Sequence, residues 1–191
     1  MFSPNRFQDV QETVKNRFEQ SILGKESKEN TYDKPENYYD SPFEEKLERS
    51  EIEETVDAYF DDLKEKSDCA DTIPSKPFEV SDLRKISPEE NEIMRDEFDD
   101  LKSGLKKEWE EKNGRPWPKY EHDVYSANGK LIRKAGSDYD AHHIQPLCLG
   151  GKNEVNNITP LRADVHYDRQ GIHSMDSPYN KICNMLGGKE S

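Results

Sequence analysis

The sequence contains no apolar run of the roughly 18 residues that a membrane-spanning helix requires. Its first segment, MFSPNRFQDVQETVKNRF, also lacks the apolar stretch of an ordinary secretory signal peptide. We therefore expect no membrane segment, and a chain that is either cytoplasmic or exported by a specialised secretion route. Apolar residues make up only 31% of the chain and charged residues 36%, so a single core filling all 191 positions is not expected.

Cysteine is scarce as well. Cys69, Cys148 and Cys183 are odd in number and far apart along the chain, and no two of them have the CxxC spacing of a zinc site. This pattern excludes a disulfide framework, and it favours free thiols in a reducing compartment. Cys148 lies between two leucines, which is more typical of a small buried thiol than of a nucleophile.

Basic charge is not in excess over any large part of the chain. The net charge is −13, and residues 1–110 carry 31 acidic and 17 basic side chains, or −14. Residues 111–191 are nearly neutral, at +1. The extended basic surface of many nucleic-acid binders is therefore absent, and a polyanionic partner would have to be held by a local patch or by a metal. We interpret the acidic runs as solvated helix faces, with mimicry of a phosphate-bearing partner as the alternative.

The first 114 residues have the apolar spacing of amphipathic helices. Apolar residues at four-residue intervals predict a helix over residues 7–23, and a polar linker follows it. A second stripe predicts one or two helices over residues 41–63. Ser87-Pro88, with a glutamate three positions after the serine, predicts the start of a third helix, which Asn113-Gly114 would end.

The pattern changes after residue 114. Asn128-Gly129 lies between two short strand-like runs and predicts a β-hairpin. YDAHHIQPL and NNITPL predict two further strands around a polar loop, and Thr159-Pro160 would begin a helix over residues 161–170. The predicted fold class is therefore α+β. Residues 1–86 would form an acidic, largely helical region for delivery or regulation, and residues 87–191 a small domain with a leading helix.

Histidine stands out against this background. Four of the five histidines fall between Tyr139 and Ser174, and two of these are adjacent: His142, His143, His166 and His173. Neutral imidazole is a common transition-metal ligand and titrates nearest to neutral pH. Adjacent residues on a strand point to opposite faces, so one of the pair can bind a metal while the other faces a substrate. A third histidine on the following helix could complete the metal site.

The stretch DAHHIQPLCLGGKNEVNNITPL, with His166 nine positions after Asn157, resembles the HNH nuclease motif, also called the ββα-metal or His-Me finger. It is most similar to the nuclease domains of colicin-type bacteriocins and bacterial polymorphic toxins, over roughly residues 108–173. The resemblance implies a small ββα domain that hydrolyses phosphodiester bonds in nucleic acid, DNA in preference to RNA. It also implies one divalent metal ion, whether Mg²⁺, Zn²⁺, Ni²⁺ or Mn²⁺.

The resemblance further implies roles for individual residues. His142 and His166 would bind the metal, and His143 would take a proton from the attacking water. Asn157 would brace the loop, while Asp140 would orient the site. Arg133 or Lys134 is a candidate for binding the scissile phosphate. Apart from the resemblance, other basic side chains nearby could supply phosphate contacts that are independent of sequence: Lys152, Arg162 and Arg169.

One position departs from the pattern of this family. Colicin-like domains place a further metal-binding histidine four residues after the second one, where this chain has Gln170. His173 follows His166 by seven residues, about 10.5 Å along a continuous helix, which is too far for two ligands of one ion. His173 can bind the metal only if Gly171 ends the helix and the chain turns back. Otherwise Gln170, a water molecule or no ligand would fill the position.

These patterns predict a non-specific, metal-dependent endonuclease that acts as a bacterial toxin in the cytoplasm of a target cell. The producing cell would then need a cognate inhibitor, or immunity, protein. An RNase toxin and an HNH endonuclease of a phage or mobile element are alternatives within the enzymes. A different class is also open, a binding module without turnover that a structural zinc ion stabilises. The two classes differ because the enzyme needs His143 for activity and not for folding.

Overall fold

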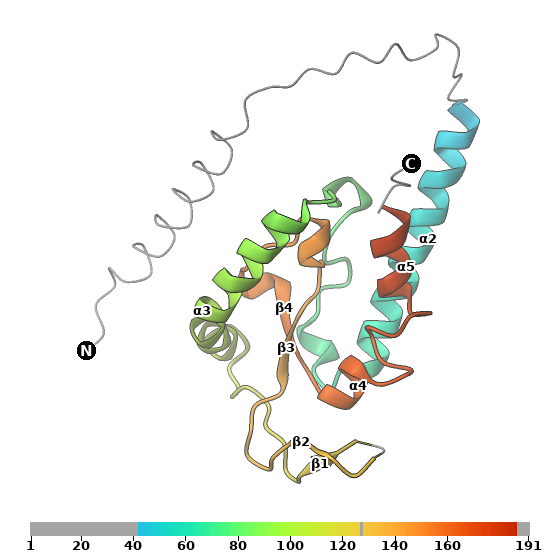
Figure 1. Ribbon diagram of the computed structural model, residues 1–191. Coiled ribbons are helices and arrows are strands. Elements are labelled where there is room, and N and C mark those ends of the chain that lie inside the picture. Colours follow the sequence, from blue (N-terminus) through green and yellow to red (C-terminus); the bar gives the residue numbers. More distant parts are fainter. Residues whose placement is uncertain (1–41, 127, 187–191) are drawn as a thin grey trace, which may run out of the picture. The chain divides into compact units, whose positions relative to one another are not determined.

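The computed structural model describes residues 42–126 and 128–186, with side chains described from residue 49 onward. The helix predicted over residues 7–23 and the linker after it lie outside this range. Within the range, no helix is both long and apolar enough to cross a membrane. The architecture is α+β, as predicted, with helices on both sides of the small antiparallel sheet β3–β4 and a second small sheet, the hairpin β1–β2, apart from them (Figure 1).

The apolar stripe predicted over residues 41–63 forms one helix, α2 (Pro42–Lys66). Its buried side chains recur every three or four residues, which places them on one face of the helix. The turns that follow contain two short 3-10 helices, η1 (Ala70–Thr72) and η2 (Val80–Asp82), which both contact α2. The buried face of α2 is made by Val56, Tyr59, Phe60 and Leu63.

Helix α3 (Pro88–Asn113) begins and ends where the sequence predicts. The Ser87 hydroxyl caps it by accepting a hydrogen bond from the backbone N–H of Glu90 at 3.1 Å. Gly114 ends it at φ 64°, a left-handed conformation that costs glycine little. Leu101, Leu105 and Trp109 are the buried residues of this helix.

The predicted hairpin is formed by β1 (Val124–Tyr125) and β2 (Leu131–Arg133), which pair antiparallel with Val124 opposite Arg133. Gly129 has φ 73°, as the connecting turn requires. Arg133, the last residue of β2, donates hydrogen bonds to Asp140, the first residue of the histidine-bearing strand described next.

The predicted order of strand, loop, strand and helix is confirmed. Strands β3 (Asp140–His143) and β4 (Ile158–Leu161) pair antiparallel, with His142 opposite Thr159 and His143 opposite Ile158. The loop between them contains two 3-10 helices, η3 (Leu147–Leu149) and η4 (Val155–Asn157), and both contact α3. Helix α4 (Ala163–Tyr167) follows β4 and contacts β3.

The prediction of a helix over residues 161–170 that begins at Thr159-Pro160 is wrong. Both residues are buried in β4, where Thr159 pairs with His142 and Pro160 with Ala141. Serine or threonine before proline is a local capping signal, but pairing with the neighbouring strand determines the backbone here. The helix, α4, is only five residues long and ends at Tyr167.

The core lies between α2, the β3–β4 sheet and the last helix, α5 (Pro178–Met185). Helices α2 and α5 pack together, and Figure 1 shows β3 and β4 between this pair and α3. The α2 segment therefore shares one core with the histidine-bearing segment, and this packing brings one of its residues into the site described below.

Candidate functional site

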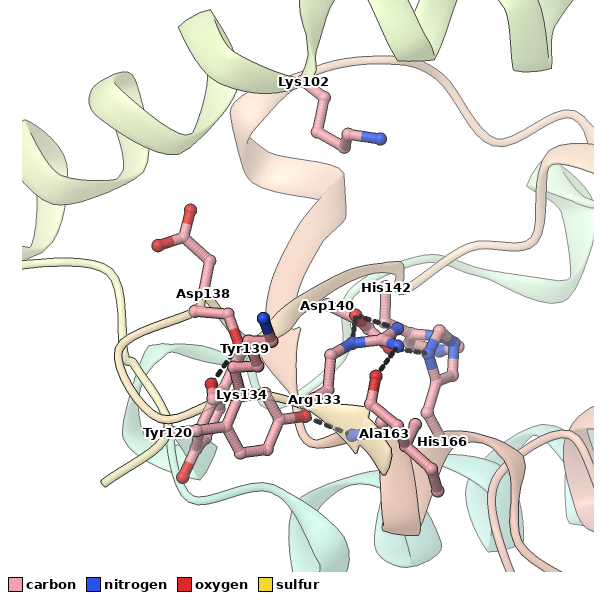
Figure 2. A network of polar contacts seen from close by, with 12 residues as sticks. Lys102, Tyr120, Arg133, Lys134, Asp138, Tyr139, Asp140, His142, Ala163 and His166 are labelled. Atoms are coloured by element: carbon pink, nitrogen blue, oxygen red, sulfur yellow. Dashed lines mark hydrogen bonds and ion pairs between the residues drawn. The ribbon is translucent and has the colours of Figure 1, made fainter. Parts of the chain in front are cut away.

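An open cleft of about 690 Å³ lies between α3 and the segment that contains β3 and α4. The four clustered histidines all line it, together with Arg133 and Asp140, so the fold gathers these six predicted residues around one space. The other predicted site residues lie outside its lining: Lys134, Lys152, Asn157, Arg162 and Arg169. Figure 2 shows Arg133 and Asp140 beside His142 and His166, with Lys102 extending from α3 on the opposite side.

His142, His166 and His173 form a group in which one ring nitrogen of each lies within 4.8 Å of the others. His142 comes from β3 and His166 from α4. His173 reaches them because α4 ends early and the chain turns back. The backbone N–H of Ile172 donates to the Val165 carbonyl at 2.8 Å, and that of His173 to the His166 carbonyl at 3.2 Å.

Gly171 makes this return possible. A Cβ atom at this position would lie 2.8 Å from the carbonyl oxygen of Val165, closer than real Cβ contacts allow. Gln170, the residue at the expected family position, is exposed, and the chain reverses immediately after it. The structure therefore brings His173 to His142 and His166 by a tight turn rather than along one face of a helix.

The Tyr59 hydroxyl determines which nitrogen of His142 carries the proton. It donates to the Ile144 carbonyl at 2.7 Å, which uses its single proton, and it lies 3.0 Å from His142 Nε2. Nε2–H of His142 must therefore donate to Tyr59, and Nδ1 holds the free electron pair. Burial, followed by the neighbouring histidines, lowers the pKa of His142 well below its usual value, so its ring is neutral at neutral pH.

Asp140 connects this group to Arg133. The Arg133 guanidinium donates to both carboxylate oxygens of Asp140, at 2.7 and 2.9 Å, while Oδ2 of Asp140 lies 3.6 Å from Nδ1 of His166. Burial of the carboxyl opposes its ionisation, but the interactions with His166 and Arg133 outweigh burial and hold the Asp140 pKa below its usual range. Asp140 is therefore an anion, and it faces Nδ1 of His166, while Nε2 of the same ring faces His142.

The three histidines are candidates to hold one metal ion. His142 Nδ1, which has a free electron pair, lies 3.1 Å from His166 Nε2, close to the roughly 3.3 Å that separates two nitrogen ligands of one tetrahedral ion. Nδ1 of His166 is buried and has no hydrogen-bond partner among the described residues. A bound ion at Nε2 would make Nδ1 a proton donor toward Asp140, the usual arrangement around a metal-bound histidine. Within residues 49–186 the group consists of three residues. Three protein ligands with a fourth position left open are typical of a metal site that binds substrate or water.

His143 points away from this group and is held by Asn153. The Asn153 amide nitrogen donates to the Met94 carbonyl at 2.9 Å and to the Glu97 carboxylate at 3.0 Å, so its oxygen must face His143 Nε2, 3.0 Å away. Nε2 is therefore the protonated nitrogen of His143, and Nδ1 is free to accept a proton. Burial lowers the pKa of His143 to about 4, although the bond to Asn153 opposes this effect.

Asn157 holds together the loop that follows His143. Its side-chain oxygen accepts a hydrogen bond from the Gln145 backbone N–H at 2.7 Å, and its amide donates to the carbonyls of Gln145 and Lys152 at 3.1 and 2.9 Å. Gly151 must be glycine for this loop to close, because a Cβ atom there would lie 2.0 Å from the Gln145 carbonyl oxygen. The catalytic importance of this bracing remains a prediction.

The basic residues predicted to contact phosphate differ in their environments. Arg133 is engaged with Asp140, as described above, and Arg162 donates two hydrogen bonds to Asp164, at 3.1 and 2.9 Å. Lys152 lies 3.8 Å from Glu154 on an exposed loop, and Lys134 and Arg169 are exposed. None of these except Arg133 faces the histidines.

A further cation at this cleft, Arg95 on α3, was not predicted from the sequence. Arg95 lines the cleft, and its charge lowers the pKa values of both His143 and His173. In the described part of the chain no ion pair or hydrogen bond to Arg95 is present, whereas Lys102 and Lys106 are paired with Asp99 and Asp138 at 2.8 and 2.9 Å. The available signal was the spacing of Arg95, Phe98 and Lys102 on one helical face.

Comparison with known proteins gives three relatives of named function. The chain is 41% identical over 110 residues to "Toxin YxiD" of Bacillus subtilis (strain 168), and 29% identical over 118 residues to "Probable deoxyribonuclease RhsB" of Dickeya dadantii (strain 3937). It is 33% identical over 66 residues to "Probable mobile endonuclease E" of Enterobacteria phage T4. These matches cover 57%, 56% and 30% of this chain.

The matches cover 19%, 7% and 47% of the relatives' own lengths, so the chain spans less than half of each. No model of a known protein family matches the chain. No solved structure matches it either. The chain is therefore, by sequence, a relative of proteins that are named as toxins and nucleases.

Proposed function

We propose that the protein is an HNH-type endonuclease that hydrolyses phosphodiester bonds with one divalent metal ion. One observation carries this proposal: a group of three histidines fit to bind a metal and a separate histidine with a free ring nitrogen line the same cleft. Metal-assisted phosphodiester hydrolysis uses both parts, since a water molecule must lose a proton while charge develops on the phosphate.

His143 is the proton acceptor in this proposal. Its burial keeps the imidazole neutral at neutral pH, and its Nε2–H is already committed to Asn153. Nδ1 can then accept a proton from a water molecule in the cleft, and the resulting imidazolium keeps its hydrogen bond to the Asn153 oxygen. Such a base contributes typically 10²–10⁴-fold to the rate.

His142, His166 and His173 would hold the ion, and Tyr59 and Asp140 would keep the rings of His142 and His166 in the binding orientation. A divalent ion bound there would offset the negative charge that develops on the phosphate and on the leaving oxygen. Nitrogen ligands suit Zn²⁺ and Ni²⁺, and a partly hydrated Mg²⁺ or Mn²⁺ is compatible with an open site.

Arg95 would contact the scissile phosphate, because its guanidinium faces the histidines and has no carboxylate partner to give up. Arg133 would contribute from the opposite wall while it remains paired with Asp140. The four exposed or peripheral basic residues would at most make backbone contacts away from the reacting centre: Lys134, Lys152, Arg162 and Arg169. Such contacts do not select a sequence, which fits a non-specific nuclease.

DNA is the proposed substrate, in preference to RNA, and the name of the Dickeya relative supports this choice. The name of the Bacillus relative supports action as a toxin, with a cognate inhibitor protein and a target-cell cytoplasm as the place of action. The name of the phage relative keeps a mobile endonuclease as the second candidate. Delivery or regulation by residues 1–86 is part of the proposal, with the addition that α2 contributes Tyr59 to the site.

The test is cleavage of supercoiled plasmid by the purified chain with Mg²⁺, Mn²⁺, Ni²⁺ or Zn²⁺ and with EDTA. His143→Ala is compared with His122→Ala, an exposed histidine outside the cleft. We expect cleavage by the wild type and by His122→Ala, its loss in EDTA, and a fall of about 10²–10⁴-fold in His143→Ala.

The same variants separate the nuclease from a structural zinc module. In a structural zinc module, removing the metal, or replacing His142, His166 or His173, would unfold the chain. His143→Ala would leave the melting temperature unchanged in either case, and only the nuclease would lose cleavage activity. Intact plasmid with cleaved RNA would move the substrate to RNA. Intact plasmid and intact RNA under every metal would contradict the proposal.

A further inference from the structure

Cys148 and Cys183 lie 35 residues apart in the sequence, yet their sulfur atoms are only 3.5 Å apart. Cys148 belongs to η3, five residues after His143, and Cys183 lies on α5. Both are free thiols that are partly buried against the core formed by α2, β4 and α5. The third cysteine, Cys69, is buried after the end of α2 and makes no contact of this kind among the described residues.

The two sulfur atoms are close enough for a disulfide to form after a small movement. A sulfur–sulfur bond is about 2.05 Å long, so the two atoms would have to approach by about 1.5 Å, a movement within the reach of side-chain rotation and small backbone shifts. Cys148 also lines the open cleft, so a small disulfide reagent can reach it from solvent.

The two thiols differ in reactivity. Either sulfur can donate in this contact, and when Cys148 is ionised the S–H of Cys183 is the donor. This hydrogen bond lowers the Cys148 pKa to about 7 despite partial burial. The same interaction, with burial, raises the pKa of Cys183. Cys148 is therefore the thiolate that attacks first, and Cys183 is the thiol placed to resolve the product.

We propose that Cys148 and Cys183 form a reversible intramolecular disulfide by exchange with a low-molecular-weight disulfide. The Cys148 thiolate attacks one sulfur of the reagent, and this breaks the reagent's bond and releases one thiolate. Cys183 then loses its proton and attacks the Cys148 sulfur, releasing the second thiolate. Two protein thiols are oxidised by two electrons in total, and one external disulfide is reduced to two thiols. This inference goes beyond the proposed nuclease activity and does not depend on it.

The bond would connect two parts of the site. The 35-residue connection from Cys148 to Cys183 contains β4, α4, His166 and His173. The Tyr179 ring, one helical turn before Cys183, packs edge-on against His173 with ring centroids 4.3 Å apart. A disulfide would hold α5, and with it Tyr179, in place. Closing a loop of this length restricts the unfolded chain, so we expect the melting temperature to rise on the order of 5–10 °C.

The experiment incubates the reduced full chain with oxidised glutathione in EDTA, then counts thiols with a maleimide and maps the peptides by mass spectrometry. Wild type and Cys69→Ser should lose two thiols and the mass of two hydrogen atoms, with the peptides that contain Cys148 and Cys183 linked. Cys148→Ser and Cys183→Ser should form no internal bond. The rise in melting temperature should appear in wild type and Cys69→Ser alone, and dithiothreitol should reverse it.

Three alkylatable thiols after oxidation would overturn the proposal, as would stable glutathione adducts on both cysteines or a bond that includes Cys69. An unchanged melting temperature of the oxidised protein would overturn the inference that a bond between η3 and α5 stabilises the fold. Because the measurements need neither metal nor substrate, their outcome is independent of nuclease activity.

Discussion

The His143 ring donates its Nε2–H to the side-chain oxygen of Asn153 over 3.0 Å. The amide of Asn153 is in turn fixed by two acceptors on α3, the Met94 carbonyl and the Glu97 carboxylate. Helix α3 thus determines, through Asn153, which nitrogen of His143 carries the proton and which is free to accept one. In the proposed reaction Asn153 is a positioning residue, since it acts through His143 and does not touch the substrate.

Replacing Asn153 with alanine should lower kcat by about 10- to 100-fold and leave KM nearly unchanged, because a residue that orients a functional histidine is lost while the phosphate contacts remain. The double variant Asn153→Asp/Glu97→Gln should recover part of the loss, since it restores an acceptor for His143 and a donor toward position 153, while the Met94 carbonyl stays without its donor. Kinetics on a fluorogenic oligonucleotide measure both effects. Equal kcat in wild type and Asn153→Ala would contradict the assignment.

Arg95→Ala should lower kcat/KM on the order of 100-fold, as expected for a lost donor to developing phosphate charge. Arg95→Lys should recover part of this, because lysine keeps the charge but not the two-pronged geometry. Thermal stability should be unchanged, since Arg95 makes no hydrogen bond or ion pair to other described residues. Lys107→Ala, an exposed lysine of α3 outside the cleft, is the matched control.

Arg133→Ala should behave differently from Arg95→Ala. It leaves the partly buried Asp140 carboxylate without its two-pronged partner, so we expect a loss of stability as well as of activity. A melting temperature that falls for Arg95→Ala and not for Arg133→Ala would reverse the two assignments.

Tyr59→Phe removes one hydroxyl and leaves both Nε2–H of His142 and the Ile144 carbonyl without their partner. We expect a loss of about 1–3 kcal/mol in the free energy of unfolding, and a fall of about 10- to 100-fold in affinity for Zn²⁺ or Ni²⁺. Urea denaturation and calorimetric metal titration measure the two quantities. Tyr179→Phe is the matched control, because no hydrogen bond to the Tyr179 hydroxyl is found in the described residues and its ring stays in place.

Alkylation of Cys148 should depend on pH in a range where the other cysteines do not react. The thiolate fraction rises with pH and is half-complete at the pKa, so the rate with iodoacetamide should climb through pH 7 and level off above pH 8. Cys183→Ala removes the hydrogen-bond donor and should move the midpoint upward, toward an ordinary thiol. Peptide mapping after short pulses gives the rate at each cysteine, and a midpoint that does not move would contradict this cause.

The parts of the fold that were predicted correctly have local causes. The α3 boundaries follow from Ser87 and Gly114, and the hairpin follows from Asn128-Gly129, because capping and turn chemistry act within a few residues. The adjacent histidines are likewise a local pattern. The helix over residues 161–170 was predicted wrongly because Thr159-Pro160 has a local meaning that pairing with β3 overrides.

The residues that were missed are brought to the site by long-range packing. Tyr59 is 83 residues from His142, and Asn153 is joined to Glu97 across 56 residues. Contacts between residues so far apart in the sequence cannot be predicted from the residue spacing within either segment. The meeting of Cys148 with Cys183 has the same cause, and it changes the meaning of two cysteines that looked isolated in the sequence.

Tyr59 lies on α2, so a protein fragment that starts at residue 87 lacks it. Such a fragment contains every clustered histidine but not the hydroxyl that sets the His142 tautomer. The missing helix is a continuous segment with its own buried face, so it could be supplied as a separate peptide. If the chain is the proposed nuclease, such a pair would be a split nuclease that is inactive in either half and regains activity on reassociation.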